Sequence, residues 1–291
     1  MLPDITARKT LLDGLPIQPR KRWGQCFLQD RNIVRKIIDL ADLQADDTVV
    51  EIGAGMGAMT ALIAHKVRRV LALEIDARLV RRLREQLATE QNIDIIPADV
   101  LNFDLARAAK DVLADQLKVI GNIPYNISTP ILFHLIAFRR RISTAVLMVQ
   151  KEVAQRIAAI PGTKEYGIPS VLTAVYAHAV SAFAVPPGCF HPEPKVMSAV
   201  LRIDFRPSPL AFMEDEDLFR EVVRLAFGNR RKTLMNNLRH SSRLNYPEQA
   251  LKLLFEHEGL DERIRGEALT PDQFIALSNA LFREGIRLFP R

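Results

Sequence analysis

The sequence predicts an α/β fold, with a mostly parallel sheet covered by helices on both faces, followed by a small all-helical domain. In the first two-thirds of the 291-residue chain, short apolar runs alternate with segments of helical spacing. This alternation is typical of strand–helix–strand units that build parallel sheets. The strand-like runs stop after the linker-like residues 206–209 (RPSP). We therefore expect one domain at residues 1–205 and a second at 206–291.

Short apolar runs bounded by turn residues predict the strands. The last of them has no crossover helix before it, so we expect it to pair antiparallel at one edge with residues 182–185. Residues 170–185 are apolar but too short for a membrane-spanning helix, which needs roughly 20 residues, and we interpret them as a buried helix followed by a buried strand. The predicted strands are residues 48–52, 70–73, 93–96, 117–120, 145–149 and 195–205.

Apolar residues at helical spacing predict the helices between and after these strands. Asp30 is placed to cap a helix whose apolar side chains, beginning at Ile33, share one face. Thr270, followed by Pro271, is a typical helix start. The other predicted helices cover residues 57–66, 79–87, 131–135, 152–159, 214–227, 230–239 and 247–256, and Pro271 opens the one over 271–283.

Composition excludes several classes of protein. An apolar share of 48% with 25% charged residues is ordinary for a soluble globular protein and excludes a disordered one. Charged residues interrupt the N-terminal 23 residues, so we expect no signal peptide. Two cysteines exclude a disulfide scaffold, show no metal-ligand spacing and favour a cytoplasmic location. The net charge of +6 indicates an anionic partner.

A glycine-rich turn follows the first long apolar strand. Residues 51–58 (EIGAGMGA) end that strand and open a helix, and glycine lets the backbone approach a ligand closely. Glu74 ends the next strand, 21 residues after Gly53, where a carboxylate can hold a ribose diol. Asp99 follows the third strand and could accept a hydrogen bond from an adenine amine. The alternatives are a tight turn without ligand, a strand-end aspartate, and a nicotinamide rather than an S-adenosylmethionine site.

A third motif, residues 121–128 (GNIPYNIS), follows the fourth strand. The N6 amine of adenine is a poor nucleophile because its lone pair is delocalised into the ring. Two fixed acceptors can hold it, namely the Asn122 side-chain oxygen and a backbone carbonyl at Ile123 or Pro124. Pro124 restricts the backbone, and Tyr125 can stack on an extruded base. In isolation, the same residues would more often form a Pro-Tyr turn that caps a strand.

This motif resembles the catalytic motif of N6-adenine methyltransferases, and nearly the whole chain resembles the ribosomal RNA adenine N6,N6-dimethyltransferases. The resemblance implies a Rossmann-like S-adenosylmethionine-dependent methyltransferase domain with a small C-terminal all-helical domain. It is greatest to the bacterial small-subunit enzymes within that family. The further segments that carry it are residues 22–28 (RWGQCFL), 150–154 (QKEVA), 166–167 (YG), 190–200 (FHPEPKVMSAV), 226–234 (AFGNRRKTL) and 265–270 (RGEALT).

The resemblance also implies roles for individual residues. The chain departs from the family at three positions, where Trp23, Cys26 and Ala54 replace the usual Phe, Asn and Pro. A cofactor contact through the backbone of residue 26 survives such a substitution. The implied catalytic residues are Asn122, Pro124 and Tyr125, and the implied cofactor-binding residues are Cys26, Leu28, Gly53, Gly55, Glu74, Asp99 and Asn122, with no metal.

The implied substrate is a pair of adjacent adenines in the 3′-terminal hairpin of 16S rRNA, each dimethylated in a pre-30S particle by a monomeric enzyme with a role in subunit biogenesis. Three basic runs, Arg20–Arg22, Arg139–Arg141 and Arg230–Lys232, would each usually be solvated surface. The third is more suggestive, since residues 226–247 hold five Lys or Arg and no Asp or Glu.

Four other functions remain open from the sequence. An Erm-type 23S rRNA methyltransferase or a DNA adenine methyltransferase would share the active site. An assembly factor that acts chiefly by binding to immature subunits would need the fold but not the chemistry. A nicotinamide oxidoreductase is disfavoured, because no motif supplies hydride-transfer chemistry.

Overall fold

The computed structural model describes residues 19–20, 24–241, 243–244 and 247–288. Lys21, Arg22 and Trp23, named above, lie outside the described residues. The chain groups into two compact units, of which the first runs to His134 and adds Arg141–Lys151 and Ala182–Arg202. The second unit joins Leu135–Arg140 and Glu152–Ser181 to the chain from Ile203 onward. The domain boundary at residues 205 and 206 stays a prediction.

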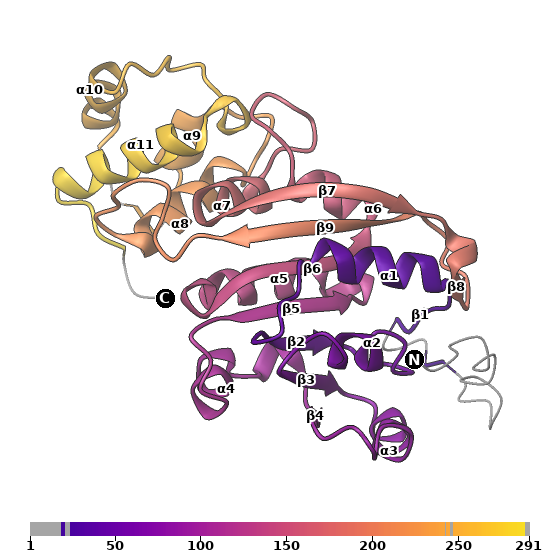
Figure 1. The fold of residues 1–291 in the computed structure, drawn as a ribbon. Helices are drawn as coiled ribbons and strands as arrows, with labels where there is room; N and C mark the ends of the chain where they lie inside the picture. Colours follow the sequence, from indigo (N-terminus) through magenta and orange to yellow (C-terminus); the bar gives the residue numbers. More distant parts are fainter. Residues whose placement is uncertain (1–18, 21–23, 242, 245–246, 289–291) are drawn as a thin grey trace. The chain divides into compact units, whose positions relative to one another are not determined.

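Seven strands form one sheet in the order β4-β3-β2-β5-β6-β9-β7 (Figure 1). The pairs β4–β3, β3–β2, β2–β5 and β5–β6 are parallel, as the strand–helix alternation predicted. Every residue of β2 is buried, which is expected when helices cover both faces of a sheet. The bounds are Thr48–Ile52 (β2), Arg69–Glu74 (β3), Ile93–Pro97 (β4), Leu117–Asn122 (β5), Ile142–Gln150 (β6), Ala177–Val185 (β7) and Ser198–Phe205 (β9).

The strand β7 lies at the edge of the sheet beside β9, and the two arrows run in opposite directions in Figure 1. This agrees with the predicted antiparallel pairing. The expectation of a buried strand over this segment is wrong, because His178, Val180, Ala182 and Ala184 are exposed. These alternate positions share one face of the strand, and that face is turned away from the core.

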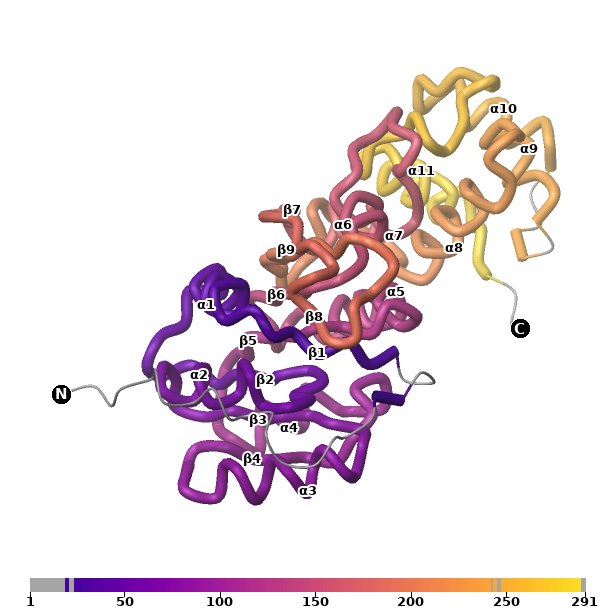
Figure 2. Tube along the Cα trace, turned by 90° about the vertical axis from the view of Figure 1, so that its right-hand side faces the viewer, coloured from indigo at the N-terminus to yellow at the C-terminus, as the bar shows by residue number. Residues whose placement is uncertain are grey.

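Two short strands, β1 (Phe27–Leu28) and β8 (Phe190–His191), form a separate antiparallel pair that the sequence did not reveal. They lie side by side in Figure 2. A run of two residues carries no periodicity, so pattern analysis cannot detect it. The pair joins the N-terminal segment to the chain between β7 and β9.

The first helix begins directly after its predicted cap, Asp30. The Asp30 side chain accepts hydrogen bonds from the backbone N–H groups of Asn32 and Ile33, at 2.8 and 3.1 Å. The second helix is shorter than predicted, because Gly57 has a φ of +79° and cannot belong to it. The bounds are Arg31–Leu40 (α1), Thr60–Ala64 (α2), Ala77–Gln86 (α3), Leu105–Asp111 (α4, not predicted) and Ser128–Ala137 (α5).

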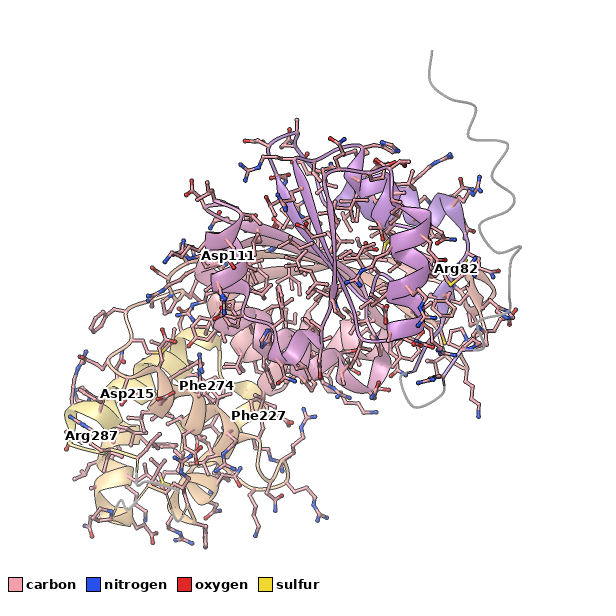
Figure 3. The ribbon with its side chains drawn as sticks, turned by 90° about the horizontal axis from the view of Figure 1, so that it is seen from below. Arg82, Asp111, Asp215, Phe227, Phe274 and Arg287 are labelled. Atoms are coloured by element: carbon pink, nitrogen blue, oxygen red, sulfur yellow. The ribbon has the colours of Figure 1, made fainter. Side chains whose placement is uncertain are left out.

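Three aromatic side chains of the second unit pack together, one before α7, one just after α8 and one in α11. The ring of Phe227 lies 5.9 Å from that of Tyr166 and 6.0 Å from that of Phe274, centroid to centroid. Phe227 and Phe274 are labelled in Figure 3. Thr270 caps the last helix as predicted, and the Gln273 side chain accepts from the Thr270 N–H in return. The bounds are Lys151–Ile157 (α6), Ile168–Tyr176 (α7), Glu216–Ala226 (α8), Leu234–Arg239 (α9), Glu248–His257 (α10) and Pro271–Arg283 (α11).

The remaining regular segments are single turns of 3₁₀ helix. Two of them lie in loops at the ends of sheet strands, with η3 after β4 and η4 after β5. The turns are Val100–Asn102 (η3), Tyr125–Ile127 (η4), Arg139–Arg141 (η5), Pro187–Cys189 (η6) and Gly266–Ala268 (η7). Among the described residues, no helix combines the length and the apolar character that crossing a bilayer requires.

A carboxyl group is buried at the centre of the sheet. Glu51, on β2, is 0% exposed, and neither of its side-chain oxygens has a hydrogen-bond partner among the described residues. Burial raises the pKa of Glu51 to about 8, the nearby Thr60 hydroxyl offsets this in part, and the charge of Glu74 adds to it. Glu51 is therefore protonated and neutral in the folded protein near neutral pH.

We expect Glu51 to make the stability of the protein depend on pH. The folded chain keeps this proton up to about pH 8, whereas the unfolded chain releases it near its ordinary value of 4.5. The folded state binds more protons within that window, so the free energy of unfolding contributed by this group falls as pH rises through it. The loss approaches about 1.4 kcal/mol per pH unit.

Urea unfolding of the wild type and of Glu51→Gln at several pH values between 5 and 8 measures this contribution. The amide cannot ionise, so the wild type should lose stability relative to the variant as pH rises. Equal pH dependence in the two proteins would show that Glu51 is not the titrating group.

Candidate functional site

A pocket opens at the carboxyl edge of the parallel sheet. Its volume is about 260 Å³, and it lies within the first unit. The chain after each of β2, β3, β4 and β5 lines it, together with Gly24–Phe27 from the N-terminal segment. Loops that follow neighbouring parallel strands meet at one edge, which is where α/β sheets bind ligands.

The glycine-rich turn forms one wall of the pocket. Gly53 and Gly55 have φ values of +70° and +58°, a region that residues with a side chain rarely adopt. A Cβ atom on Gly55 would lie 3.3 Å from the ring of Phe27. The Gly53 N–H donates to the carbonyl of Leu73 at 2.9 Å, which holds the turn against the end of β3. Glycine at these positions therefore leaves room for a ligand close to the backbone.

Glu74 ends β3 at the floor of the pocket and is 5% exposed. One carboxylate oxygen accepts from the Gly55 N–H at 2.9 Å, and the other accepts from the Asp76 N–H at 2.8 Å. Burial raises the pKa of Glu74, and these two backbone hydrogen bonds partly counter the rise. The carboxylate thus holds the glycine turn in place and also faces the pocket.

Asp76 links this floor to the N-terminal segment. It accepts an ion-pair hydrogen bond from Arg78, and the Gln25 side-chain amide donates to it at 3.4 Å. Burial works to raise the pKa of Asp76, but the hydrogen bonds from Arg78 and Gln25 outweigh it, and the pKa is lowered. A charged Asp76 is therefore available to keep Gln25, and with it the N-terminal segment, beside the pocket.

Asp99 lies on the pocket wall after β4. Its side chain also begins the turn η3, by accepting from the Leu101 N–H at 3.0 Å. Asp99 therefore makes the strand-end turn contact that the sequence left open as an alternative. The same residue also lines the pocket. Val100 beside it supplies an apolar surface.

Asn122 ends β5 with its side-chain amide tied to the N-terminal segment. The amide nitrogen donates to the backbone carbonyl of Cys26 at 2.8 Å. Because the nitrogen is used in this way, the side-chain oxygen is the group that can accept a hydrogen bond from a ligand. The Cys26 contact is made by the backbone and does not depend on the side chain at this position.

The residues after Asn122 place an aromatic ring at the pocket. The Ile123 N–H donates to the Met148 carbonyl at 2.9 Å, which ties the loop to β6. Pro124 has a φ of −54°, and Tyr125 begins the turn η4. The Tyr125 hydroxyl lies 2.7 Å from the hydroxyl of Ser198. Burial raises the pKa of Tyr125, with the Ser198 hydrogen bond opposing the rise, so the phenol is neutral at physiological pH.

Cys26 and Leu28, the implied cofactor-binding residues of the N-terminal segment, differ in their placement. Cys26 lines the pocket, and burial raises the pKa of its thiol. Leu28 does not line it; this side chain is 7% exposed and belongs to the hydrophobic core under β1. The Leu28 backbone pairs with Phe190. Any contact of Leu28 with a bound molecule would therefore have to come from its backbone.

Phe27 and Ile75 are among the apolar pocket residues that the sequence did not assign to the site. Phe27 lies against the glycine turn, and Ile75 follows Glu74 with 49% of its surface exposed. The sequence held no signal for Ile75, because its exposure is known only from the structure. Ile75 offers a flat apolar surface beside the polar groups of Glu74 and Asp99.

Known proteins resemble the chain over most of its length. Residues 17–282 match the family described as ribosomal RNA adenine dimethylase. Proteins named ribosomal RNA small subunit methyltransferase A are 44% identical in Syntrophus aciditrophicus, over 95% of this chain and 99% of that protein, and 41% identical in Streptococcus thermophilus, over 98% and 99%.

Solved structures agree with this comparison. A dimethyladenosine transferase from Plasmodium falciparum has a TM-score of 0.77 at 25% identity and covers 90% of this chain and 100% of its own. The 23S rRNA methyltransferase ErmE has a TM-score of 0.67 at 28% identity and covers 88% and 99%. The family match, the identity over nearly the full length and the shared fold agree, and the chain belongs to the ribosomal RNA adenine dimethylase family, whose members are S-adenosylmethionine-dependent methyltransferases.

Proposed function

We propose that the protein transfers methyl groups from S-adenosylmethionine to N6 of two adjacent adenines in the 3′-terminal hairpin of 16S rRNA, and dimethylates each. One observation carries the proposal. The Asn122 amide nitrogen is committed to the Cys26 carbonyl, so the amide oxygen is the acceptor left for a target amine, on the wall that also holds Tyr125. The small-subunit names of the relatives support the choice of RNA.

The residues of the pocket fit the cofactor. The glycine turn leaves space that a Cβ would fill, and Glu74 and Asp99 present carboxylates on neighbouring strand ends. In our proposal Glu74 accepts from the ribose hydroxyls, Asp99 accepts from the adenine amine of the cofactor, and Ile75 contacts the adenine ring. Cys26, and Leu28 through its backbone, border the bound cofactor. When bound, S-adenosylmethionine supplies a methyl group on a sulfonium, which is already activated for displacement.

The target amine requires a second acceptor besides Asn122. The Pro124 carbonyl already accepts from the Ile127 N–H at 3.1 Å and from the Ser128 hydroxyl at 3.4 Å. We therefore assign the second acceptor to the Ile123 carbonyl. Two acceptors favour a more tetrahedral nitrogen, whose lone pair is then available for attack. The role of Pro124 is to fix the backbone that presents this carbonyl.

Dimethylation requires the same groups to work twice. After the first transfer the amine has one N–H left, so one of the two acceptors must release its hydrogen bond in the second round. No strong general base is needed, because the nitrogen becomes acidic once it carries the added methyl group. Tyr125 holds the base by stacking in both rounds, which depends on the ring and not on the number of methyl groups.

We assign RNA phosphate binding to the basic run Arg230–Lys232 of the second unit, but its three residues do not contribute equally. Arg230, Arg231 and Lys232 lie in the turns before α9 and not in a helix. Arg230 donates to the Tyr166 carbonyl at 2.7 Å and lies 3.5 Å from a Glu267 oxygen. Its side chain therefore also holds the fold together. Arg231 and Lys232 are exposed, and they are the better candidates for phosphate contacts.

The cellular setting is part of the same proposal. We infer a monomeric cytoplasmic enzyme that acts on a pre-30S particle, with residues 206–291 as its RNA-binding domain. Cys26 and Cys189 are both free thiols, which is typical of a reducing compartment. The likeness to ErmE keeps large-subunit RNA as the alternative substrate that an experiment must exclude. A role exerted mainly by binding to immature subunits is the other alternative.

We expect Glu74→Ala to bind S-adenosylmethionine at least tenfold more weakly. The substitution removes a charge-assisted hydrogen bond, typically about 1.5–3 kcal/mol, and releases the glycine turn at Gly55. Isothermal titration calorimetry measures the effect, and Glu85→Ala, an exposed carboxylate on α3, is the matched control. Unchanged affinity in a folded Glu74 variant, or tight NADH binding by the wild type, would contradict the assignment.

The salt dependence of RNA binding tests the second unit. Replacing Arg231 and Lys232 with Ala removes up to two phosphate contacts, so the slope of log affinity against log salt should flatten by about 1.4, at roughly 0.7 per phosphate for single strands. The control is the double variant Arg107→Ala with Lys110→Ala on α4, which removes the same charge. Its slope should stay steeper than that of the Arg231 and Lys232 variant. Equal slopes in the two double variants would place Arg231 and Lys232 on ordinary solvated surface.

The methylated product tests the function as a whole. The enzyme is incubated with small subunits from an unmethylated strain, and the digested RNA is analysed by mass spectrometry. We expect dimethyladenine at two adjacent positions, and little product from short naked hairpins or mature subunits, because extruding the base costs a few kcal/mol that only correctly placed RNA contacts offset.

Tyr125→Ala is the paired variant for that experiment. It should keep cofactor affinity and lose most turnover, because Tyr125 contacts the base and not the cofactor. A product that stops at monomethyladenine, or methyl groups found only on large-subunit RNA or DNA, would overturn the proposed substrate. Wild-type subunit binding without any methyl transfer would favour the binding-dominated role.

A further inference from the structure

The hydroxyl of Tyr125 is engaged by a residue from a distant part of the chain. The Tyr125 and Ser198 hydroxyl oxygens lie 2.7 Å apart, although the residues are 73 positions apart in the sequence. Ser198 is the first residue of β9 and is 0% exposed, whereas Tyr125 is partly buried at the pocket. Both residues belong to the first unit. The far end of the aromatic ring is therefore attached to the sheet.

The anchor for this hydrogen bond is rigid. The carbonyl of Met197, the residue before Ser198, accepts from the Lys151 N–H at 3.0 Å, which ties the start of β9 to the end of β6. Ala199 and Val200, which follow, are buried at 2% and 0% exposure. Ser198 thus has a fixed backbone on both sides, and its short side chain has one rotatable bond before the hydroxyl.

The ring of Tyr125, in contrast, has limited support from its own segment. Tyr125 begins a single 3₁₀ turn of three residues, in which none is buried. Pro124 restricts the backbone at the near end, but a tyrosine side chain still rotates about two bonds. Stacking on a base requires the ring to lie in one place, so a ring whose far end is unattached would lose freedom about the first of these bonds each time a base enters.

We propose that Ser198 is a positioning residue, which holds the far end of the Tyr125 side chain, fixes where the ring lies for the target adenine and thereby raises the rate of methyl transfer. This inference rests on the proposed function of Tyr125. It also explains the choice of amino acid, since a phenylalanine ring could stack equally well and only tyrosine can be held at its far end. Ser198 acts through Tyr125 and makes no contact with the cofactor in this proposal.

A double-mutant cycle tests the inference, with single-turnover methylation of small subunits from an unmethylated strain as the readout. The variants are Tyr125→Phe, Ser198→Ala and the double variant. Each single change should slow methyl transfer three- to tenfold. The double variant should be no slower than the slower single variant, because both changes remove the same hydrogen bond. Cofactor affinity should stay within twofold of the wild type.

Controls separate positioning from a loss of fold. Ser278→Ala also removes a buried serine hydroxyl, from α11, but that hydroxyl has no hydrogen-bond partner among the described residues. It should methylate at the wild-type rate. Ser198→Thr keeps the hydroxyl and should recover at least half of the rate lost in Ser198→Ala. The KM for subunits should change less than twofold in Ser198→Ala, so that the loss appears in the transfer rate.

Two results would overturn the inference. One is a wild-type transfer rate in Ser198→Ala. The other is a double variant whose loss equals the product of the two single losses, which would mean independent roles. These results differ from failure of the proposed function, in which the wild type itself gives no dimethyladenine. If the wild type is active, Tyr125→Ala is slow and Ser198→Ala is normal, only the inference about Ser198 fails.

Discussion

The site depends on the register that makes neighbouring parallel strands end together. Ile52 at the end of β2 pairs with Leu73 on β3 and with Gly121 on β5. A Cβ on Gly121 would lie 3.0 Å from the Ile52 carbonyl oxygen, so glycine is what allows β2 and β5 to approach here. A shift of one residue would move Glu74 and Asn122 to different depths and turn their side chains to the other face. The register of the sheet thus sets the distance between Glu74 and Asn122 at the pocket.

The polar groups at this edge hold the fold together and, in the proposed function, also bind the ligands. Glu74 holds the glycine turn through Gly55, Asp99 begins a turn, and Asn122 ties down the N-terminal segment through Cys26. Each leaves acceptor capacity toward the pocket, since a carboxylate or amide oxygen can accept more than one hydrogen bond. Preorganisation follows from this arrangement, because the groups are already oriented by backbone contacts before a ligand enters. It also means that substitutions there change both binding and local structure.

Methyl transfer to a delocalised amine demands orientation more than acid–base strength, and the architecture meets that demand. The neutral Tyr125 phenol is fixed on one side by Pro124 and on the other by Ser198. The buried neutral Glu51 lies one strand residue before Ile52 and brings no negative charge to the edge near pH 7. In the second unit, Arg230 shows that a basic run divides between structural and exposed side chains. The charge count of such a run therefore overstates the number of cations that can meet RNA.

The sequence by itself determined the parallel strands, the capped helices at Asp30 and Thr270, and the order of the glycine turn, Glu74, Asp99 and the Asn122 motif. These follow from local propensity and periodicity, which neighbouring residues encode. Only the tertiary structure decided that Cys26 orients Asn122 through its backbone, that Leu28 belongs to the core, and that Ser198 holds Tyr125. The first and last of these contacts join residues 96 and 73 positions apart. No periodicity extends over such separations, because strand pairing and burial, rather than local spacing, bring those side chains together.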